Sequence, residues 1–249
     1  MILVTGATGR VGRGVCAGLA GAGAAWRALV RDPERASAAG LPAAHCVRGD
    51  LLDPTALGAA MAGVERLFLA GPDSADAAAR EIAVIDAARI AGVRQVVKLS
   101  AFAAGCRPPL SFGIAHAEVE AHLGSSGLAW TVLRPYMFMQ TLLEFARPVA
   151  GGNLPMPLGR GRVALVDARD VAAVAVARLL APVPPAGEVL VLTGPQALSG
   201  EAMALGIAGA CGHRVRYRAV PAWLAGVLMR AGGTPRWDCR MRLALFRML

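Results

Sequence analysis

The sequence predicts an α/β fold in which a doubly wound parallel sheet is followed by a smaller C-terminal lobe. Short apolar segments alternate with longer segments of helical period, which is typical of parallel strands joined by crossover helices. The length of 249 residues suits one large α/β domain or two small ones. Hydrophobic residues make up 55% of the chain and charged residues 17%, so a core can form and intrinsic disorder is excluded.

The elements are expected in a strand–helix alternation along the chain. The apolar residues of 2–5 predict a buried strand, and Val11, Val15 and Leu19 then fall on one face of a helix. Short apolar runs predict further strands at 26–30, 45–48, 66–70, 95–100, 129–134, 163–166, 188–192 and 215–220. Helical spacing predicts further helices at 54–62, 75–91, 114–123, 171–180, 198–211 and 222–230.

Local signals mark the ends of several elements. Asp53 and Asp170 precede predicted helices as N-cap residues, and Gly92 follows one at the C′ position. The segments 148–161 and 181–187 are rich in proline and glycine, so we expect them to be loops.

A glycine-rich turn follows the first predicted strand and opens the first helix. Gly6 permits the tight turn, Gly9 lets the backbone approach a pyrophosphate, and Gly12 lets the helix pack closely on the sheet. The helix N-terminus offers N–H groups and the positive end of its dipole to the phosphates. The motif therefore predicts a Rossmann-type dinucleotide site. Its expected binding residues are Gly6, Thr8, Gly9, Arg10, Val11 and Gly12.

Arg31 follows the second predicted strand. An NAD site has an acid there, which accepts a hydrogen bond from the ribose 2′-OH. Arginine instead holds a 2′-phosphate by charge-assisted hydrogen bonds, so Arg31 favours NADPH over NADH. Asp32 follows directly and moderates this preference. The alternative is that Arg31 is a solvated strand end.

These signals divide the chain into two parts. We expect residues 1–150 to form an NAD(P)-binding core and residues 151–249 a smaller substrate-binding lobe, interleaved with the core in one folded unit. Ligands of open α/β sheets bind at the carboxyl ends of the strands, where the strand order reverses. A cleft between core and lobe is the expected place for a small-molecule substrate.

The net charge of +9 is unevenly distributed, because residues 213–249 carry eight arginines and one acid. Arg214, Arg216 and Arg218 alternate with less polar residues, which favours a solvated basic face of a strand. An acidic substrate group or a negatively charged partner surface ranks second, and nucleic acid third, because no recognition motif supports it. Arg236 and Arg240 have the i,i+4 spacing of an expected terminal helix.

Several classes of protein are disfavoured. No charge-free run reaches the roughly 18 residues of a membrane span. The chain shows no signal-peptide pattern, so we expect a cytoplasmic, bacterial protein. The five cysteines are odd in number and lack C-x-x-C spacing, which argues against a disulfide framework or a metal site and favours small buried hydrophobes.

Further segments share one order and spacing with a known family. They are residues 48–51, 68–72, 97–101, 116–120, 126–135, 138–140, 166–172 and 192–195. With them the chain, from Met1 to about Val220, resembles the NmrA-like family of atypical short-chain dehydrogenases/reductases. That family includes NAD(P)H:quinone reductases, triphenylmethane reductase and NADP-sensing regulators.

The resemblance implies roles for individual residues. It places Asp50 and Leu51 beside the adenine and Ser100 near the nicotinamide. It places Ala70 and Gly71, followed by Pro72, beside the nicotinamide ribose, and Pro135 over the carboxamide. The first part of the substrate wall would be Tyr136, Met137, Phe138 and Met139. Thr141 replaces the asparagine of many relatives, and the C-terminus is short, so the shape of the pocket is left open.

The residues that do chemistry differ from those of ordinary short-chain dehydrogenases. Neither tyrosine has a lysine four residues on, so the Tyr-x-x-x-Lys pair is absent. His116 is the candidate proton donor, at what resembles the position of a catalytic lysine in isoflavone-type reductases. The equal alternative is a structural histidine. Glu120 either orients His116, one helical turn away, or is a solvated helix residue. Lys98, the only lysine, shares a strand face with Ser100, and both are candidate catalytic residues.

Three functions are compatible with this pattern. The preferred one is an NADPH-dependent oxidoreductase that transfers hydride to a flat, apolar quinone-like or conjugated aromatic or polyketide-type molecule. The alternatives are a non-catalytic NADP(H)-sensing regulator that binds a protein, and a cofactor-binding biosynthetic enzyme without net redox chemistry. A monomer or homodimer is expected in each case.

Overall fold

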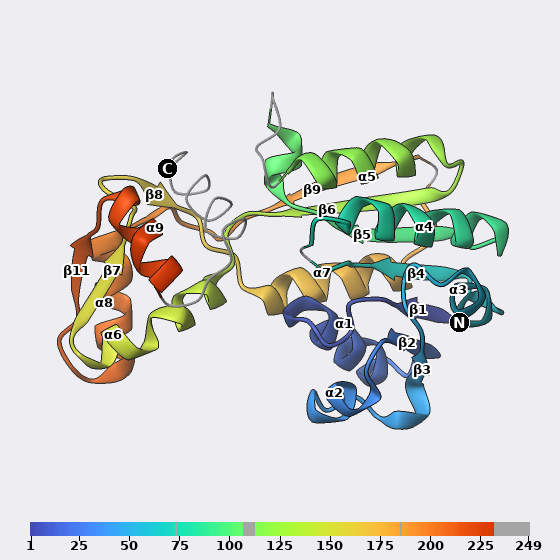
Figure 1. The fold of residues 1–249 in the computed structure, drawn as a ribbon, viewed down its shortest axis with the longest axis horizontal. Helices are drawn as coiled ribbons and strands as arrows, with labels where there is room; N and C mark the ends of the chain where they lie inside the picture. Colours follow the sequence, from blue (N-terminus) through green and yellow to red (C-terminus); the bar gives the residue numbers. More distant parts are fainter. Residues whose placement is uncertain (73, 107–112, 185, 232–249) are drawn as a thin grey trace. The chain divides into compact units, whose positions relative to one another are not determined.

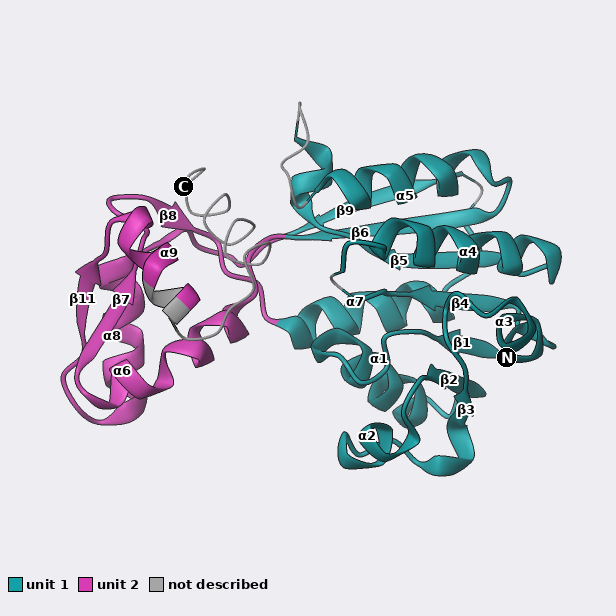
Figure 2. Ribbon diagram, viewed as in Figure 1, with its two compact units in different colours: residues 1–135, 168–192 teal, residues 136–167, 193–249 magenta. Residues whose placement is uncertain are grey.

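The computed structural model describes residues 1–72, 74–106, 113–184 and 186–231, and the chain divides into two compact units (Figures 1 and 2). Unit 1 comprises Met1–Pro135 and Ala168–Leu192. Unit 2 comprises Tyr136–Asp167 and the described residues from Thr193 onward. The chain leaves unit 1 at residue 135 rather than at the expected 150, because the sixth strand of the large sheet ends there.

Unit 1 is built on a seven-stranded parallel sheet of order β3-β2-β1-β4-β5-β6-β9. The strands are β1 (Ile2–Val4), β2 (Trp26–Val30), β3 (Cys46–Arg48), β4 (Arg66–Leu69), β5 (Gln95–Leu99), β6 (Ala129–Pro135) and β9 (Glu188–Leu192). Each lies within about a residue of its predicted range. The order reverses between β1 and β4, so the doubly wound α/β fold predicted from the sequence is confirmed.

Helices cover both faces of this sheet. α1 (Arg10–Gly21) packs on α7 (Ala168–Leu180). α3 (Pro54–Met61), α4 (Ala77–Ile90) and α5 (Ile114–Ser125) pack in sequence on one another. Alternate strand residues divide between the two layers: Leu3 joins the core under α3–α5, and its neighbours Ile2 and Val4 are buried on the opposite face.

Capping explains where some of the helices begin and end. Asp53 caps α3 by accepting hydrogen bonds from the amides of Thr55 and Ala56 at 2.9 and 3.1 Å, as predicted. Gly92 has φ +73°, the left-handed conformation expected after α4. Asp170 is not a cap, because α7 already begins at Ala168 and Asp170 lies in its first turn.

The structure contains short elements that the sequence patterns missed. α2 (Pro33–Ala38) is one of them, and η1 (Ala43–His45) and η2 (Phe102–Gly105) are 3-10 turns. The cysteines also differ from expectation: Cys16 is buried and Cys46 and Cys106 are half-buried, but Cys211 is exposed. Cys239 lies outside the described residues.

Unit 2 has two small sheets: β7 (Asn153–Met156) with β11 (Arg216–Ala219), parallel, and β8 (Arg162–Val163) with β10 (Leu198–Ser199), antiparallel. Its helices are η3 (Met139–Phe145), α6 (Ala146–Ala150), α8 (Gly200–Cys211) and α9 (Ala222–Ala231).

The predictions for unit 2 need two corrections. The expected loop 148–161 contains β7, whose alternate residues Leu154 and Met156 are fully buried. The expected strand 163–166 is only the two residues of β8 plus a single bridge between Phe138 and Val166.

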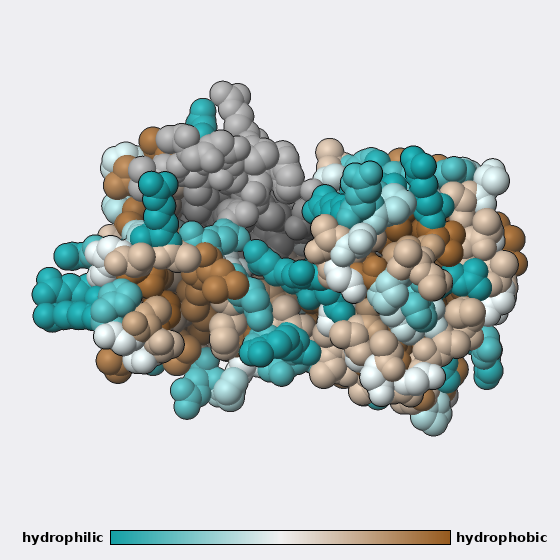
Figure 3. Space-filling view, turned by 90° about the horizontal axis from the view of Figure 1, so that it is seen from below, coloured by the Kyte–Doolittle hydropathy of each residue, from teal (hydrophilic) through white to brown (hydrophobic). Residues whose placement is uncertain are grey.

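Surface polarity is mixed on the face that Figure 3 shows, where hydrophilic and hydrophobic residues both reach the surface of each unit. On β11, Arg216 and Arg218 are exposed and Tyr217 is half-buried, as the predicted alternation requires, but Ala219, at the next inward position, is exposed as well. Arg236, Asp238, Arg240, Arg242 and Arg247 lie outside the described residues. None of the helices in the described ranges is both long and apolar enough to cross a membrane.

Candidate active site

The glycine-rich turn forms a close backbone cradle between β1 and α1. Gly6 has φ +62°, and a Cβ there would lie 2.9 Å from the carbonyl oxygen of Ala70. A Cβ on Gly12 would overlap the carbonyl of Gly6. Both positions therefore require glycine, as the motif predicted, while Val11 is buried in the core and Thr8 is half-buried.

The amino end of α1 is left open for an anion. Its N-cap is Gly9, which makes no side-chain hydrogen bond to the first turn. Side chains do cap α2, α3 and α8, through Asp32, Asp53 and Ser199. The unfilled cap, the glycine cradle and the exposed Arg10 fit a pyrophosphate.

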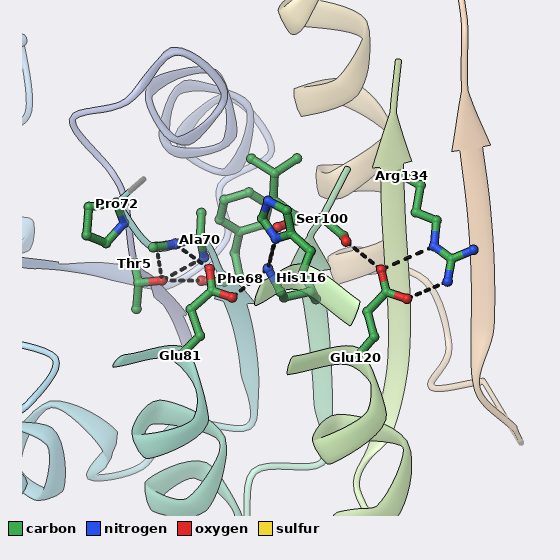
Figure 4. Close-up of polar contacts among 12 residues, drawn as sticks. Thr5, Phe68, Ala70, Pro72, Glu81, Ser100, His116, Glu120 and Arg134 are labelled. Atoms are coloured by element: carbon green, nitrogen blue, oxygen red, sulfur yellow. Dashed lines mark hydrogen bonds and ion pairs between the residues drawn. The ribbon is translucent and has the colours of Figure 1, made fainter. Parts of the chain in front are cut away.

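Thr5 joins the ends of β1 and β4 beside this cradle. Its buried Oγ1 accepts a hydrogen bond from the amide of Ala70 and lies within bonding distance of the Ala70 carbonyl, both at 2.9 Å (Figure 4). The contact places the glycine turn next to Ala70 and Gly71, where the strand order reverses. The residues expected to hold the phosphates and the nicotinamide ribose are thus neighbours.

The edge expected to bind the adenosine is charged. Arg31 is exposed, and the Asp32 carboxylate next to it accepts hydrogen bonds from Glu34 and Arg35 amides of α2 at 2.9 and 3.1 Å. The Asp32 carboxylate, which moderated the predicted preference for NADPH, is thus engaged in capping α2.

Asp50 and Leu51 have different environments. Asp50 accepts from the Leu52 amide and pairs with Arg80 at 2.7 Å, and these contacts lower the pKa of its carboxyl group. Arg80 also pairs with Asp76 at 2.8 Å. Leu51 is buried in the core under α3, so its side chain contributes packing there.

A buried network lies at the carboxyl end of β5. Lys98 is fully buried and pairs with Glu81 of α4, its Nζ lying 2.6 Å from Oε2. The other carboxylate oxygen of Glu81 accepts a hydrogen bond from the Gly71 amide at 2.7 Å. The Lys98 Nζ also lies 3.3 Å from Nδ1 of His116, on the first turn of α5. Glu81 therefore links the ribose loop to Lys98 and, through Lys98, to His116.

His116 is a neutral imidazole in this environment. Burial, and next the charge of Lys98, lower its pKa to about 3. It therefore carries no positive charge near neutral pH, and the expectation that it donates a proton as an imidazolium has no support from its surroundings.

Ser100 belongs to a second hydrogen-bond network, which also contains Glu120 and Arg134. Its hydroxyl donates a hydrogen bond to Glu120, whose carboxylate also accepts two from Arg134, at 3.1 and 2.5 Å (Figure 4). These hydrogen bonds, above all, raise the pKa of the Arg134 guanidinium. Glu120 thus neither contacts His116 nor is solvated, which corrects both expectations for it.

Sequence reasoning missed Glu81 and Arg134. Glu81 occupies the core-facing positions of α4 together with Val84, Ile85 and Ala88, at the i, i+3, i+4, i+7 spacing of an apolar stripe. The sequence did contain a signal for this ion pair: a carboxylate lies in the apolar stripe of a helix, and the chain has a single lysine. Arg134 gave no such signal, because the position of a residue in a strand does not reveal its hydrogen-bond partner on another element.

The residues expected to cover the carboxamide and substrate follow β6. Pro135 is the buried last residue of that strand, in unit 1. In unit 2, Met137 is buried in the apolar core, Tyr136 and Phe138 are half-buried, and Met139 is exposed. Within the described ranges, no group of three or more histidine, cysteine, aspartate or glutamate residues could hold a metal ion.

Comparison with known proteins identifies the family of the chain. A family model described as NAD(P)H-binding matches residues 6–182. An NAD(P)H azoreductase of Xenophilus azovorans is 38% identical over 236 residues, which cover 94% of this chain and 82% of that protein. Quinone oxidoreductase 2 of Escherichia coli is 32% identical over 223 residues, 88% of this chain and 77% of that protein. The NADPH complex of an Escherichia coli NADPH-dependent quinone oxidoreductase superposes with a TM-score of 0.86 at 27% identity, covering 99% of this chain and 88% of the other.

Proposed function

The chain belongs to the NAD(P)H-binding family of oxidoreductases, and we propose that it transfers hydride from NADPH to a flat, conjugated acceptor such as a quinone or an azo compound. The resemblance to NmrA-like reductases is confirmed by these relatives. The expectations of a monomer or homodimer and of a cytoplasmic location stay predictions.

One observation carries the choice of substrate class. Among the described residues, the edge of the sheet beside the glycine cradle shows no strong acid: Lys98 is paired with Glu81, and His116 is neutral. The sequence also lacks the Tyr-x-x-x-Lys pair. An ordinary ketone needs a proton donor as hydride arrives. A quinone or azo group spreads the added charge over a conjugated system, so it suits a site without such a donor.

The residues of unit 1 would hold the cofactor. The α1 amino end with Gly6, Gly9 and Gly12 would bind the pyrophosphate, and Arg31 the 2′-phosphate. When bound, NADPH supplies a hydride from its reduced nicotinamide ring. The acceptor gains this hydride and takes one proton from water, so that a quinone becomes a hydroquinone. Ala70, Gly71 and Pro135 would position the ring by backbone contacts and exclude water from it.

The substrate wall would combine aromatic and thioether side chains. Met139 is the exposed member of the four candidates after β6, Tyr136 and Phe138 are half-buried, and Met137 is buried in the core of unit 2. Flexible apolar surfaces of this kind bind flat aromatic ligands.

A direct assay tests the proposal. The protein is mixed with NADPH and a panel of quinones, azo compounds and simple ketones, and the absorbance of the reduced nicotinamide is followed. We expect NADPH to be consumed with quinones or azo compounds and not with ketones. Tight NADPH binding without oxidation by any acceptor would instead identify a nucleotide sensor.

The cofactor preference has its own test. Because a charge-assisted hydrogen bond contributes about 1.5–3 kcal/mol, Arg31→Ala should weaken NADPH binding by about ten- to a hundredfold and leave NADH nearly unchanged. Arg35→Ala, an exposed arginine of α2, is the matched control. Calorimetric titration of both cofactors gives the values, and equal weakening of NADPH and NADH by Arg31→Ala would contradict the assignment.

A further inference from the structure

The three acceptors around Lys98 determine how its ammonium group is oriented. Its Nζ lies 2.6 Å from Glu81 Oε2, 2.6 Å from the Leu99 carbonyl oxygen and 3.3 Å from His116 Nδ1. An ammonium has three N–H donors and no acceptor. Each N–H therefore has one partner, and Nδ1 of His116 must accept.

This contact selects one tautomer of His116. A ring nitrogen that accepts a hydrogen bond carries no proton, so the proton of the neutral ring is on Nε2. Protonating Nδ1 as well would bring an N–H group against the Lys98 ammonium. The low pKa of His116 agrees with this geometry.

Glu81 is the residue that makes this arrangement possible. A lone ammonium buried in an apolar core loses its proton, and a neutral amine no longer has to donate to His116. Glu81 forms the ion pair with Lys98, and its second carboxylate oxygen accepts a hydrogen bond from the Gly71 amide. The charge therefore stays in one position relative to the ribose loop and α5.

The other charged groups that face α5 are already paired. Glu120, on the same helix, binds Arg134 of β6 and Ser100. Asp86 of α4 pairs with His122 at 2.9 Å, at the far end of α5. Among the described residues, Lys98 is thus the charged side chain that acts on the His116 ring, and Glu81 acts through Lys98.

We propose that Glu81 and Lys98 are positioning residues that hold His116 as a neutral imidazole whose Nε2–H donates a hydrogen bond to the substrate. The bond is made to the quinone oxygen or azo nitrogen that becomes negative as hydride arrives. A fixed neutral donor stabilises developing charge without giving up its proton, which comes from water afterwards. The donor role rests on the proposed reductase function, whereas the tautomer does not.

The tautomer can be read in the protein without a substrate. The chain has four histidines, so ¹⁵N-histidine labelling gives a resolvable long-range ¹H–¹⁵N spectrum, assigned with His116→Gln. We expect His116 to show a protonated Nε2 and to stay neutral between about pH 5 and about pH 8, where an ordinary histidine titrates. A protonated Nδ1, or titration in that range, would overturn the proposal.

Variants separate positioning from simple packing. Lys98→Met removes the neighbouring positive charge and the donor to Nδ1, so it should raise the pKa of His116 toward its usual value. Glu81→Gln keeps the acceptor for Gly71 but removes the charge that pairs with Lys98, so it should change the pKa of His116. Glu118→Gln, an exposed glutamate of α5, is the matched control and should change nothing. Equal effects of Glu81→Gln and Glu118→Gln would refute the role of Glu81. If either network variant fails to fold, the wild-type spectrum still decides the tautomer.

Kinetics then test the donor role. With an accepted quinone, His116→Gln and Glu81→Gln should lower kcat at least tenfold with little change in the KM for NADPH, and the wild-type kcat should show no acid limb above about pH 5. Unchanged kcat in His116→Gln would refute the donor role. Failure of the reductase function appears only in the absorbance assay, and failure of the tautomer only in the spectrum.

Discussion

The single lysine of the chain is among its most deeply buried side chains. Taking an ammonium and a carboxylate out of water is costly, so a buried pair persists only when its hydrogen bonds are complete. Lys98 and Glu81 meet this condition, with Gly71, Leu99 and His116 as further partners. Arginine would bring five donors where three acceptors are placed, which explains the compact ammonium here.

Breaking this ion pair should therefore cost more than deleting both of its charges. Lys98→Met leaves a buried carboxylate unpaired and should lower the free energy of unfolding by about 3–5 kcal/mol. Lys98→Met with Glu81→Gln should recover most of that loss, because the amide still accepts from Gly71. Urea unfolding of the three variants measures the coupling. A double variant as unstable as the sum of the single ones would contradict the ion pair.

His116 makes stability depend on pH. Its pKa is lowered from 6.5 to about 3 in the folded protein, so below pH 6.5 the unfolded chain binds a proton there that the folded chain does not. Stability from this residue is complete above about pH 6.5 and is lost as the pH falls toward 3. Between pH 6.5 and pH 4.5 the wild type should lose about 2 kcal/mol more than His116→Gln. Parallel pH profiles in urea unfolding would exclude the shift.

At the scale of elements, α1 is both the helix proposed to bind the cofactor's phosphates and half of the α1–α7 layer. A Cβ on Gly14 would lie 2.7 Å from that of Ala172, and one on Gly18 2.8 Å from Cγ2 of Val176. These glycines let the two helices approach closely. The same packing holds the amino end of α1 in place over the sheet, so this helix contact supports the proposed phosphate site.

Enlarging a residue in this contact should destabilise unit 1. Gly14→Leu places a side chain where Ala172 lies, and overpacking of this kind costs about 1–3 kcal/mol. Gly58→Ala is the control: it lies inside α3 with open space around it and should stabilise by about 0.5–1 kcal/mol. Thermal unfolding of both variants decides, and Gly14→Leu as stable as the wild type would show that α7 yields at this contact.

At the scale of the whole molecule, the sequence reveals periodic and local features and hides contacts between distant residues. The strands of unit 1 are predictable because their apolar runs are continuous, and α3 because Asp53 caps it. β7 is hidden because Pro155 interrupts a strand whose partner, in the part of the chain that the structure describes, is β11, some sixty residues later. The glycine cradle is predictable because its glycines lie close together in the sequence. The Glu81–Lys98 pair joins two elements, and no spacing rule connects such residues.

NADPH binding should raise the free energy of unfolding, and a change that distorts the glycine cradle should reduce this increase. NADPH at a hundred times its Kd contributes about 2.7 kcal/mol, which for a chain of this size raises Tm by about 5–10 °C. Gly12→Ala puts a Cβ against the Gly6 carbonyl and should abolish most of that rise, measured from its own ligand-free Tm, because the turn that holds the pyrophosphate must open. Gly58→Ala should keep the full rise. Calorimetric scans with and without NADPH provide the test, and a rise in Gly12→Ala equal to that of the wild type would place the phosphates away from the amino end of α1.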